Sequence, residues 1–201
     1  MPQTRSPASR LIAPLVVLAA TIAQLVVATA AGDSARFASK GFGARLVLYP
    51  ILMLIVPAVW FLLHRGRPWA EAPWAGFTLV MIPFLVDVTG NTLNLYDSIS
   101  WWDDANHFVN WFLLCLGLAL VLDVRSVRPA WAGGAVVVGG GALLALAWEL
   151  GEWWTFIRHG TELATAYEDT LGDMTLGTCG AFVAFLVLRF VVRRAAHDLT
   201  P

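Results

Sequence analysis

Long apolar runs separated by short polar segments dominate the hydropathy pattern of the chain. Six such runs can be distinguished, and they cover approximately residues 11–31, 46–63, 74–95, 103–122, 131–154 and 169–194. Each has roughly the 17–25 residues that a helix needs to cross the hydrocarbon core of a bilayer. A membrane-spanning segment must satisfy its backbone polar groups internally, so such runs form helices. The pattern therefore predicts an all-α, polytopic transmembrane bundle with six spans.

The composition agrees with this class of protein. Of the 201 residues, 58% are hydrophobic and only 13% are charged, and the mean hydropathy is +0.69. These values lie outside the usual range of soluble globular domains. The formal net charge is -1 and there is no basic tract, so the lipid bilayer is the expected partner and nucleic acid is not.

The apolar runs predict a single transmembrane domain over residues 11–194, with short cytoplasmic tails at 1–10 and 195–201. The first run leaves one alternative open. The triplet Ala28-Thr29-Ala30 at its end could serve as a signal-peptidase site, in which case residues 1–30 would be removed. The run is nevertheless longer than a typical signal-peptide core of about 7–15 residues and long enough to span. We therefore favour a retained first helix.

The distribution of Lys and Arg predicts the orientation, because cytoplasmic loops carry an excess of these residues. With six spans, nine basic residues fall on the side of the two termini and four on the other side. The nine are Arg5, Arg10, Arg65, Arg67, Arg125, Arg128, Arg189, Arg193 and Arg194, and the four are Arg36, Lys40, Arg45 and Arg158. We expect a multi-pass protein of the bacterial inner membrane with both termini in the cytoplasm.

Paired acidic residues stand at the outer ends of the last two runs. Glu149 and Glu152 are three residues apart, and Asp169 and Asp173 are four apart, so each pair lies on one face of a helix. Charged groups in a bilayer are energetically expensive, and they usually face the interior of a bundle. We therefore expect these side chains to gather in the extracytoplasmic half of the bundle.

Two further runs add polar residues to the same half. His107 follows Asp103 by four residues and Asp104 by three, so either carboxylate can share its helix face and fix its tautomer. Asp87 and Asn91 lie four residues apart inside the third run. An isolated intramembrane aspartate is a functional-site hypothesis in its own right.

These residues define the candidate site. The candidate metal ligands are Asp87, Asp104, His107, Glu149, Glu152, Asp169 and Asp173, and the catalytic candidates are His107, Glu149, Glu152 and Asp173. Because no Lys or Arg apart from Arg158 is expected nearby, the carboxylates need shared protons, a bound cation or a water-filled cavity. Oxygen donors suit Mg²⁺, Ca²⁺ or Mn²⁺, and the added imidazole makes Zn²⁺ or Fe²⁺ candidates. A divalent cation is thus a candidate cofactor, with proton sharing as the alternative.

The two cysteines do not extend this site. Cys115 and Cys179 both lie inside apolar runs. We interpret them as small core residues rather than a disulfide or a metal pair.

The order of the motifs resembles that of a known family. Asp-Asp-x-x-His-Phe at 103–108, Trp-Glu-x-x-Glu-Trp at 148–153 and Asp-Thr-x-x-Asp-Met at 169–174 are similar to motifs of the YjdF-like family of small bacterial inner-membrane proteins. By this resemblance, the family's polar motif positions are Asp104, His107, Glu149, Glu152, Asp169 and Asp173. More distantly, the pattern is similar to VanZ-like proteins, which carry amides where this chain has Glu152 and Asp173. The resemblance implies a site and supplies no reaction.

Three classes of function remain open. The first is a membrane enzyme that uses His107 and the carboxylates on a lipid-linked or amphiphilic substrate at the outer leaflet. The second is a small transporter or proton-coupled permease whose acids relay protons or bind a cationic substrate. The third is a non-catalytic membrane partner protein whose polar network locks helices together. The cytoplasmic halves of the last three runs are apolar, which disfavours a continuous transport path.

Overall fold

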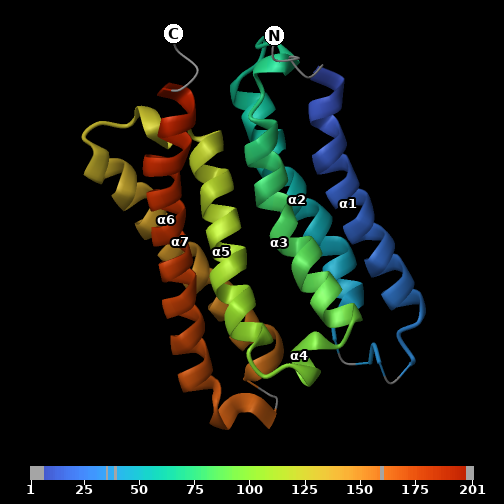
Figure 1. The fold of residues 1–201 in the computed structure, drawn as a ribbon. Coiled ribbons are helices and arrows are strands. Elements are labelled where there is room, and N and C mark those ends of the chain that lie inside the picture. The colour runs from blue at the N-terminus through green and yellow to red at the C-terminus, as the bar shows by residue number, and fades with distance from the viewer. Residues whose placement is uncertain (1–6, 35, 39, 159–160, 198–201) are drawn as a thin grey trace. The chain divides into compact units, whose positions relative to one another are not determined.

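A computed structural model describes residues 7–34, 36–38, 40–158 and 161–197. The described residues form helices and no strand. Six helices are long and apolar enough to cross a membrane (Figure 1). They are α1 (Pro7–Ala30), α2 (Phe42–Leu63), α3 (Trp74–Thr92), α5 (Trp102–Val121), α6 (Ala130–Glu152) and α7 (Ala166–His197). The prediction of an all-α membrane bundle with six spans is confirmed at this level.

Short helical segments lie between the long helices. They are α4 (Leu95–Ser98), the 3₁₀ turns η1 (Trp69–Glu71), η2 (Val124–Ser126) and η4 (Thr161–Ala164), and the π-helical turn η3 (Trp153–Ile157), which continues α6. The third apolar run was predicted to reach residue 95, but α3 ends at Thr92. The reason is Asn94, which adopts a left-handed conformation with a φ of 61° and so cannot continue a right-handed helix.

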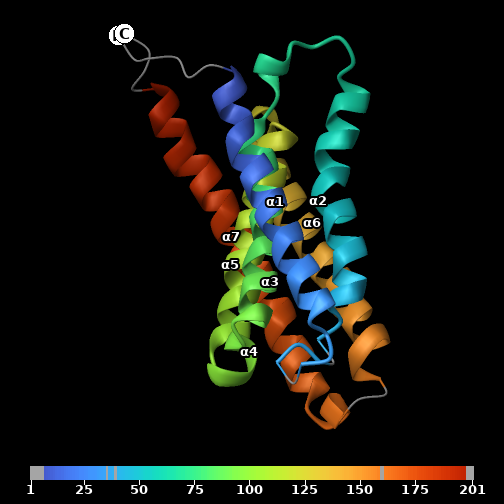
Figure 2. The same ribbon diagram turned by 90° about the vertical axis from the view of Figure 1, so that its right-hand side faces the viewer.

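The described chain falls into two compact units, divided after Ser100. In the first unit, α1 packs against both α2 and α3, and α1 and α2 lie closest together near their connecting loop (Figure 2). A polar link joins two of these helices, because the Gln24 amide donates to Thr89 Oγ1 at 3.1 Å and accepts from Thr92 Oγ1 at 3.0 Å. A single domain over residues 11–194 stays a prediction.

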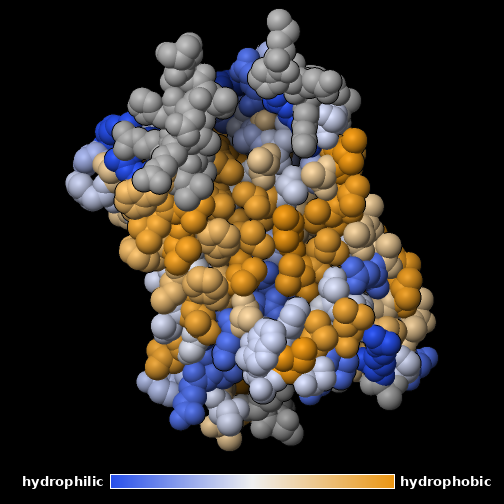
Figure 3. Space-filling view, viewed as in Figure 1, coloured by the Kyte–Doolittle hydropathy of each residue, from blue (hydrophilic) through white to orange (hydrophobic). Residues whose placement is uncertain are grey.

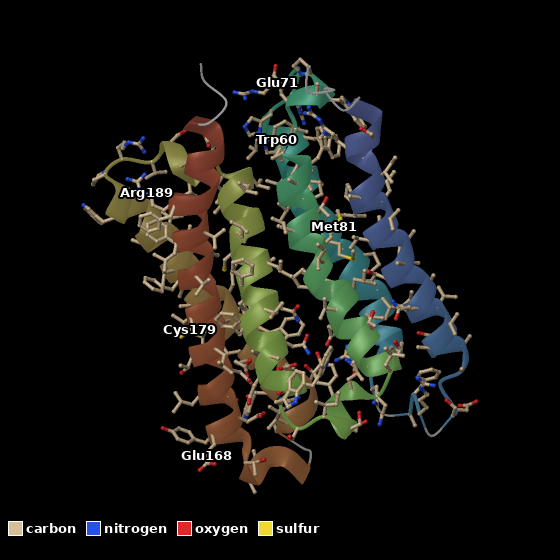
Figure 4. All side chains as sticks on the ribbon, viewed as in Figure 1. Trp60, Glu71, Met81, Glu168, Cys179 and Arg189 are labelled. Atoms are coloured by element: carbon tan, nitrogen blue, oxygen red, sulfur yellow. The ribbon has the colours of Figure 1, made fainter. Side chains whose placement is uncertain are left out.

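In the second unit, α7 packs along both α5 and α6 (Figure 1). Small residues permit this approach: Gly180 of α7 lies directly against the backbone of Phe108 and Phe112 in α5. Such close contacts through glycine are typical of helix pairs in membranes. Cys115 is buried as predicted, but Cys179 is exposed on α7 (Figure 4), so its interpretation as a core residue is wrong.

The surface of each unit has the polarity of a membrane protein. Hydrophobic residues gather over the middle of the helices, and hydrophilic residues lie towards their ends (Figure 3). Large apolar side chains such as Val27, Leu63 and Leu143 are more than half exposed. A soluble protein rarely exposes contiguous apolar surface on this scale, whereas lipid covers it at no cost.

Candidate functional site

A histidine–carboxylate cluster lies in the second unit, where the first two turns of α5 and α7 meet the last turn of α6. It comprises Asp103, His107, Glu149, Glu152 and Asp173. In Figure 4, nitrogen and oxygen atoms gather on α5 and α7 at the end of α7 that carries Glu168. The sequence placed acids and a histidine at these helix ends, and three helices bring them together here.

His107 lies at the centre of the cluster, and both of its ring nitrogens face carboxylates. Its Nε2 is 3.7 Å from Asp103 Oδ1 and 3.6 Å from Asp173 Oδ2, and its Nδ1 is 3.8 Å from Glu149 Oε1. One donor atom each from Asp103, His107 and Asp173 lies within 4.8 Å of the others. The same is true of His107, Glu149 and Glu152. The imidazole therefore joins two groups of possible ligands.

Most of the cluster is buried. Glu149 and Asp173 are each 3% exposed, and His107 is 9% exposed. No Lys or Arg among the described residues forms an ion pair with Glu149 or Asp173. Arg158, the basic residue expected nearby, instead lies with its guanidinium 3.5 Å from the ring centroid of Trp154. Buried carboxylates without a cationic partner are unfavourable when ionised, so the cluster needs a proton or a cation.

Two oxygens in this region lack a partner. Glu149 Oε1 and Asn110 Oδ1 are buried and accept no hydrogen bond from any described residue. The Thr170 side chain lies beside the Glu149 carboxylate, a neighbour that sequence reasoning missed. Thr170 stands next to Asp169 in the third motif, so its place in that motif was the available signal. A buried acceptor with no donor is energetically costly.

Asp104 and Asp169, the two remaining candidates from these helices, are both exposed. Neither belongs to the two ligand groups found among the described residues. Asp103 rather than Asp104 lies beside His107, although spacings of three and four residues both permit a shared helix face.

Asp87 belongs to the first unit, where it has its own partners. Its carboxylate accepts hydrogen bonds from Tyr49 Oη at 2.5 Å, Tyr96 Oη at 3.0 Å and Asn91 Nδ2 at 3.1 Å. Arg45 Nε lies 3.6 Å from its Oδ2. The prediction that no basic residue other than Arg158 pairs with these acids is therefore wrong for Asp87.

The reason for this error is the start of α2. That helix begins at Phe42 rather than near residue 46, so Arg45 lies inside its first turn, four residues before Tyr49, and not in the preceding loop. Arg45 and Tyr49 thus share a helix face. Asp87 joins α2, α3 and α4 through these contacts.

Lys40 makes a similar contact at the end of the first unit. Its ammonium group donates to Asn94 Oδ1 at 2.6 Å and to Asp97 Oδ2 at 2.7 Å. Asp97 is 60% exposed in this pair, so the contact contributes little to stability.

The fold and the cluster define a polytopic helical membrane protein with a buried polar site at one end of α5, α6 and α7. The model of a family described as predicted membrane protein (DUF2238) matches residues 13–194. The chain therefore belongs to this family. No curated protein and no solved structure matches it.

Proposed function

We propose that this protein is a multi-pass enzyme of the bacterial inner membrane that holds a divalent cation between His107, Glu149 and Glu152. Its substrate would be lipid-linked or amphiphilic and would lie at the outer leaflet. The observation that carries the proposal is Glu149 Oε1, which is buried, accepts no hydrogen bond from the described residues and lies 3.8 Å from His107 Nδ1. A cation between these two atoms would be bound by both and would give Glu149 Oε1 a partner.

The spacing of the donor atoms supports this ligand set. With metal–ligand bonds of about 2.1 Å, two ligands at angles of about 90–110° lie roughly 3.0–3.5 Å apart. The separation of 3.8 Å between His107 Nδ1 and Glu149 Oε1 is longer than a hydrogen bond and slightly longer than this range. A contraction of a few tenths of an ångström would suffice. One imidazole with two carboxylates suits Zn²⁺, Mn²⁺ or Fe²⁺ better than Mg²⁺ or Ca²⁺.

Carboxylates on the other side of the imidazole could orient His107 as a metal ligand. His107 Nε2 faces the buried Asp173 and the half-exposed Asp103. A carboxylate on the second ring nitrogen of a ligating histidine fixes its tautomer and raises its basicity. Asp173 is thus a positioning residue in this proposal, and Asp103, which reaches solvent, is the group best placed to exchange protons. The cation would supply polarisation of a carbonyl or phosphoryl oxygen.

Aromatic side chains at the same end of the second unit support an amphiphilic substrate. Trp101, Trp153, Trp154 and Tyr167 are all between 45% and 78% exposed. Exposed tryptophan and tyrosine mark the level of the lipid headgroups. The excess of Lys and Arg on the opposite side would make this the outer leaflet. The resemblance to YjdF-like proteins rests on the motifs at 103–108, 148–153 and 169–174. These motifs contain the residues of the cluster, so the resemblance supports the cluster as a site.

A transporter is less well supported. In the described part of the second unit, the buried polar side chains are Asn106, His107, Glu149 and Asp173, and all lie at the cluster end. The buried side chains nearer the other end are apolar, and they include Trp111, Cys115, Ala119, Val137, Ala181, Ala184 and Leu188. Proton relays and ion paths need polar groups along their length, so this packing favours an enzyme or a purely structural network.

Metal analysis of the purified full-length protein distinguishes a metal-dependent enzyme from a purely structural network. We expect about one equivalent of metal per chain and a rise in the unfolding temperature on adding Zn²⁺ or Mn²⁺, because a ligand that binds only the folded state stabilises it. Both effects should be lost in Glu149→Gln. The control is Glu168→Gln, which removes an exposed carboxylate from the first turn of α7 and should change neither. A native protein with no metal and no stabilisation by added cations would overturn the proposal and leave a proton-sharing network.

A further inference from the structure

A second polar feature lies in the second unit, far along α7 from the cluster. It is a pocket of about 290 Å³ formed by η2, the start of α6 and a late turn of α7. Arg125, Arg128 and Arg189 line it, together with the apolar side chains of Phe185 and Leu188. Glu168 and Arg189 lie towards opposite ends of α7 (Figure 4).

The arginines of this pocket are only partly neutralised. One acid, Asp123, also lines it, and its Oδ1 lies 3.6 Å from Arg125 Nε. Arg128 donates to the backbone carbonyls of Arg125 and Val127 at 2.6 and 3.1 Å, and these contacts leave its charge unopposed. Among the described residues of the lining, three arginines and one aspartate leave a formal excess of two positive charges.

Arg189 is the strongest indication of a ligand. It is half-buried on α7, and it forms no ion pair or hydrogen bond within the described residues. Partial burial of a charge without a partner is unfavourable. An anion in the pocket would supply that partner.

The start of α6 adds to the positive potential. Ala130, the first residue of α6, lines the pocket, and no side chain caps this end of the helix. The N–H groups at the start of a long helix and its dipole favour an anion at the N-terminus. Arginine side chains and a helix terminus in one pocket are a combination well suited to phosphate.

We propose that this pocket binds the phosphate of an anionic phospholipid headgroup. The apolar floor of Phe185 and Leu188 suits the glycerol and first carbons of a lipid better than a fully hydrated ion. Trp131 and Phe190, which follow Ala130 and Arg189 in the sequence, are 74% and 63% exposed and offer apolar surface to acyl chains. Basic pockets between transmembrane helices are a recurrent means of binding anionic lipids. A volume of about 290 Å³ is enough for a headgroup alone.

Native mass spectrometry of the full-length protein in detergent tests the proposal. Phosphatidylglycerol and phosphatidylcholine with identical acyl chains are added at equal concentrations, and inorganic phosphate is added in a separate arm. We expect the wild-type protein to retain phosphatidylglycerol preferentially. Arg189→Gln should reduce this retention about tenfold, the effect of losing one charge-assisted hydrogen-bonding group.

The matched control is Arg65→Gln, which removes the same charge from an exposed arginine after α2 that is expected on the same side of the membrane. Its retention of phosphatidylglycerol should equal that of the wild type. If Arg189→Gln does not fold, Arg125→Gln takes its place.

Three results would overturn the proposal. The first is equal retention of the two lipids by the wild-type protein, which requires no variant. The second is an equal loss in Arg65→Gln, which would indicate general surface charge. The third is binding of inorganic phosphate that depends on Arg189 without any preference between the lipids, which would assign the pocket to a free anion.

Discussion

His107 on α5 and Glu149 on α6 face each other across a helix interface, with 3.8 Å between Nδ1 and Oε1. Both side chains are buried, and Asp173 of α7 approaches the opposite ring nitrogen at 3.6 Å. The imidazole is therefore enclosed by acids from two other helices. Any cation or proton that neutralises this cluster also ties the three helices together, so ligand binding and stability should be coupled.

Asp103 and Asp104 provide a matched test of the cluster. Asp103→Asn should weaken binding of Zn²⁺ or Mn²⁺ about tenfold, because it removes a carboxylate from the second nitrogen of His107. Asp104→Asn should leave binding unchanged, because that side chain is exposed and lies outside the two ligand groups among the described residues. The metal affinity of each variant is measured by following its unfolding temperature as Zn²⁺ or Mn²⁺ is added. Equal effects of the two substitutions would contradict the assignment of Asp103 to the cluster.

Asp87 should behave as a structural residue. Asp87→Asn leaves Arg45 without its carboxylate partner in a pair whose side chains are only 15% and 16% exposed. We expect a loss of about 2 kcal/mol in the free energy of unfolding, less than for a fully buried pair, with no change in metal content. Denaturant unfolding in detergent and metal analysis measure the two quantities.

The control for Asp87 is Asp97→Asn. That carboxylate is 60% exposed beside Lys40, and its removal should change the free energy of unfolding by less than about 1 kcal/mol. Loss of metal from Asp87→Asn at unchanged stability would contradict this structural role and support Asp87 as a metal ligand, as its isolated position in the third apolar run predicts.

The contact between α5 and α7 should depend on one glycine. A Cβ at Gly180 would collide with the carbonyl oxygen of Phe108 and lie 2.9 Å from the backbone nitrogen of Phe112. Backbone atoms cannot move aside as flexible side chains do, so Gly180→Ala should push the helices apart and destabilise the protein by about 2 kcal/mol or more. Gly172→Ala is the control, since a Cβ there meets nothing within 4 Å. It should be neutral or slightly stabilising in the same unfolding assay.

The sequence predicted the helices well because length and hydropathy alone decide whether a segment can span a bilayer. It could not place their ends, which depend on local conformations such as the left-handed Asn94. Because the helix ends were not predicted, the basic partner of Asp87 was not predicted either. The sequence pattern predicts Arg45 to be a loop residue that indicates orientation, but the early start of α2 places it beside Asp87.

Within the cluster, helical spacing predicted which residues of one helix share a face. Spacing within one helix could not decide between Asp103 and Asp104, because that choice depends on how α5 is rotated against α6 and α7. The contact of Thr170 with Glu149 and the pocket around Arg189 likewise arise from packing between helices. From the sequence alone, the arginines of this pocket indicate only the orientation of the chain in the membrane.

The last prediction concerns which side of the membrane carries the cluster. Nine of the thirteen Lys and Arg residues would be cytoplasmic if both termini are, and this bias normally sets the orientation. Single cysteines can report it in a background in which the native thiols are replaced. Cys179 is exposed and should tolerate Ser. Cys115 packs close to Gly141, so Ala is the substitution that avoids new strain.

Cysteines introduced at Ser98 and Thr165 should react with a membrane-impermeant maleimide applied to intact cells. Those at Arg67 and Ser126 should react only after the membrane is permeabilised. All four positions are exposed, and Arg67 is preferable to the neighbouring Gly66, whose φ of 89° would strain any side chain. Labelling in the opposite pattern would place the histidine–carboxylate cluster on the cytoplasmic face and the arginine pocket on the outer face. The substrate of the cluster would then have to be sought inside the cell.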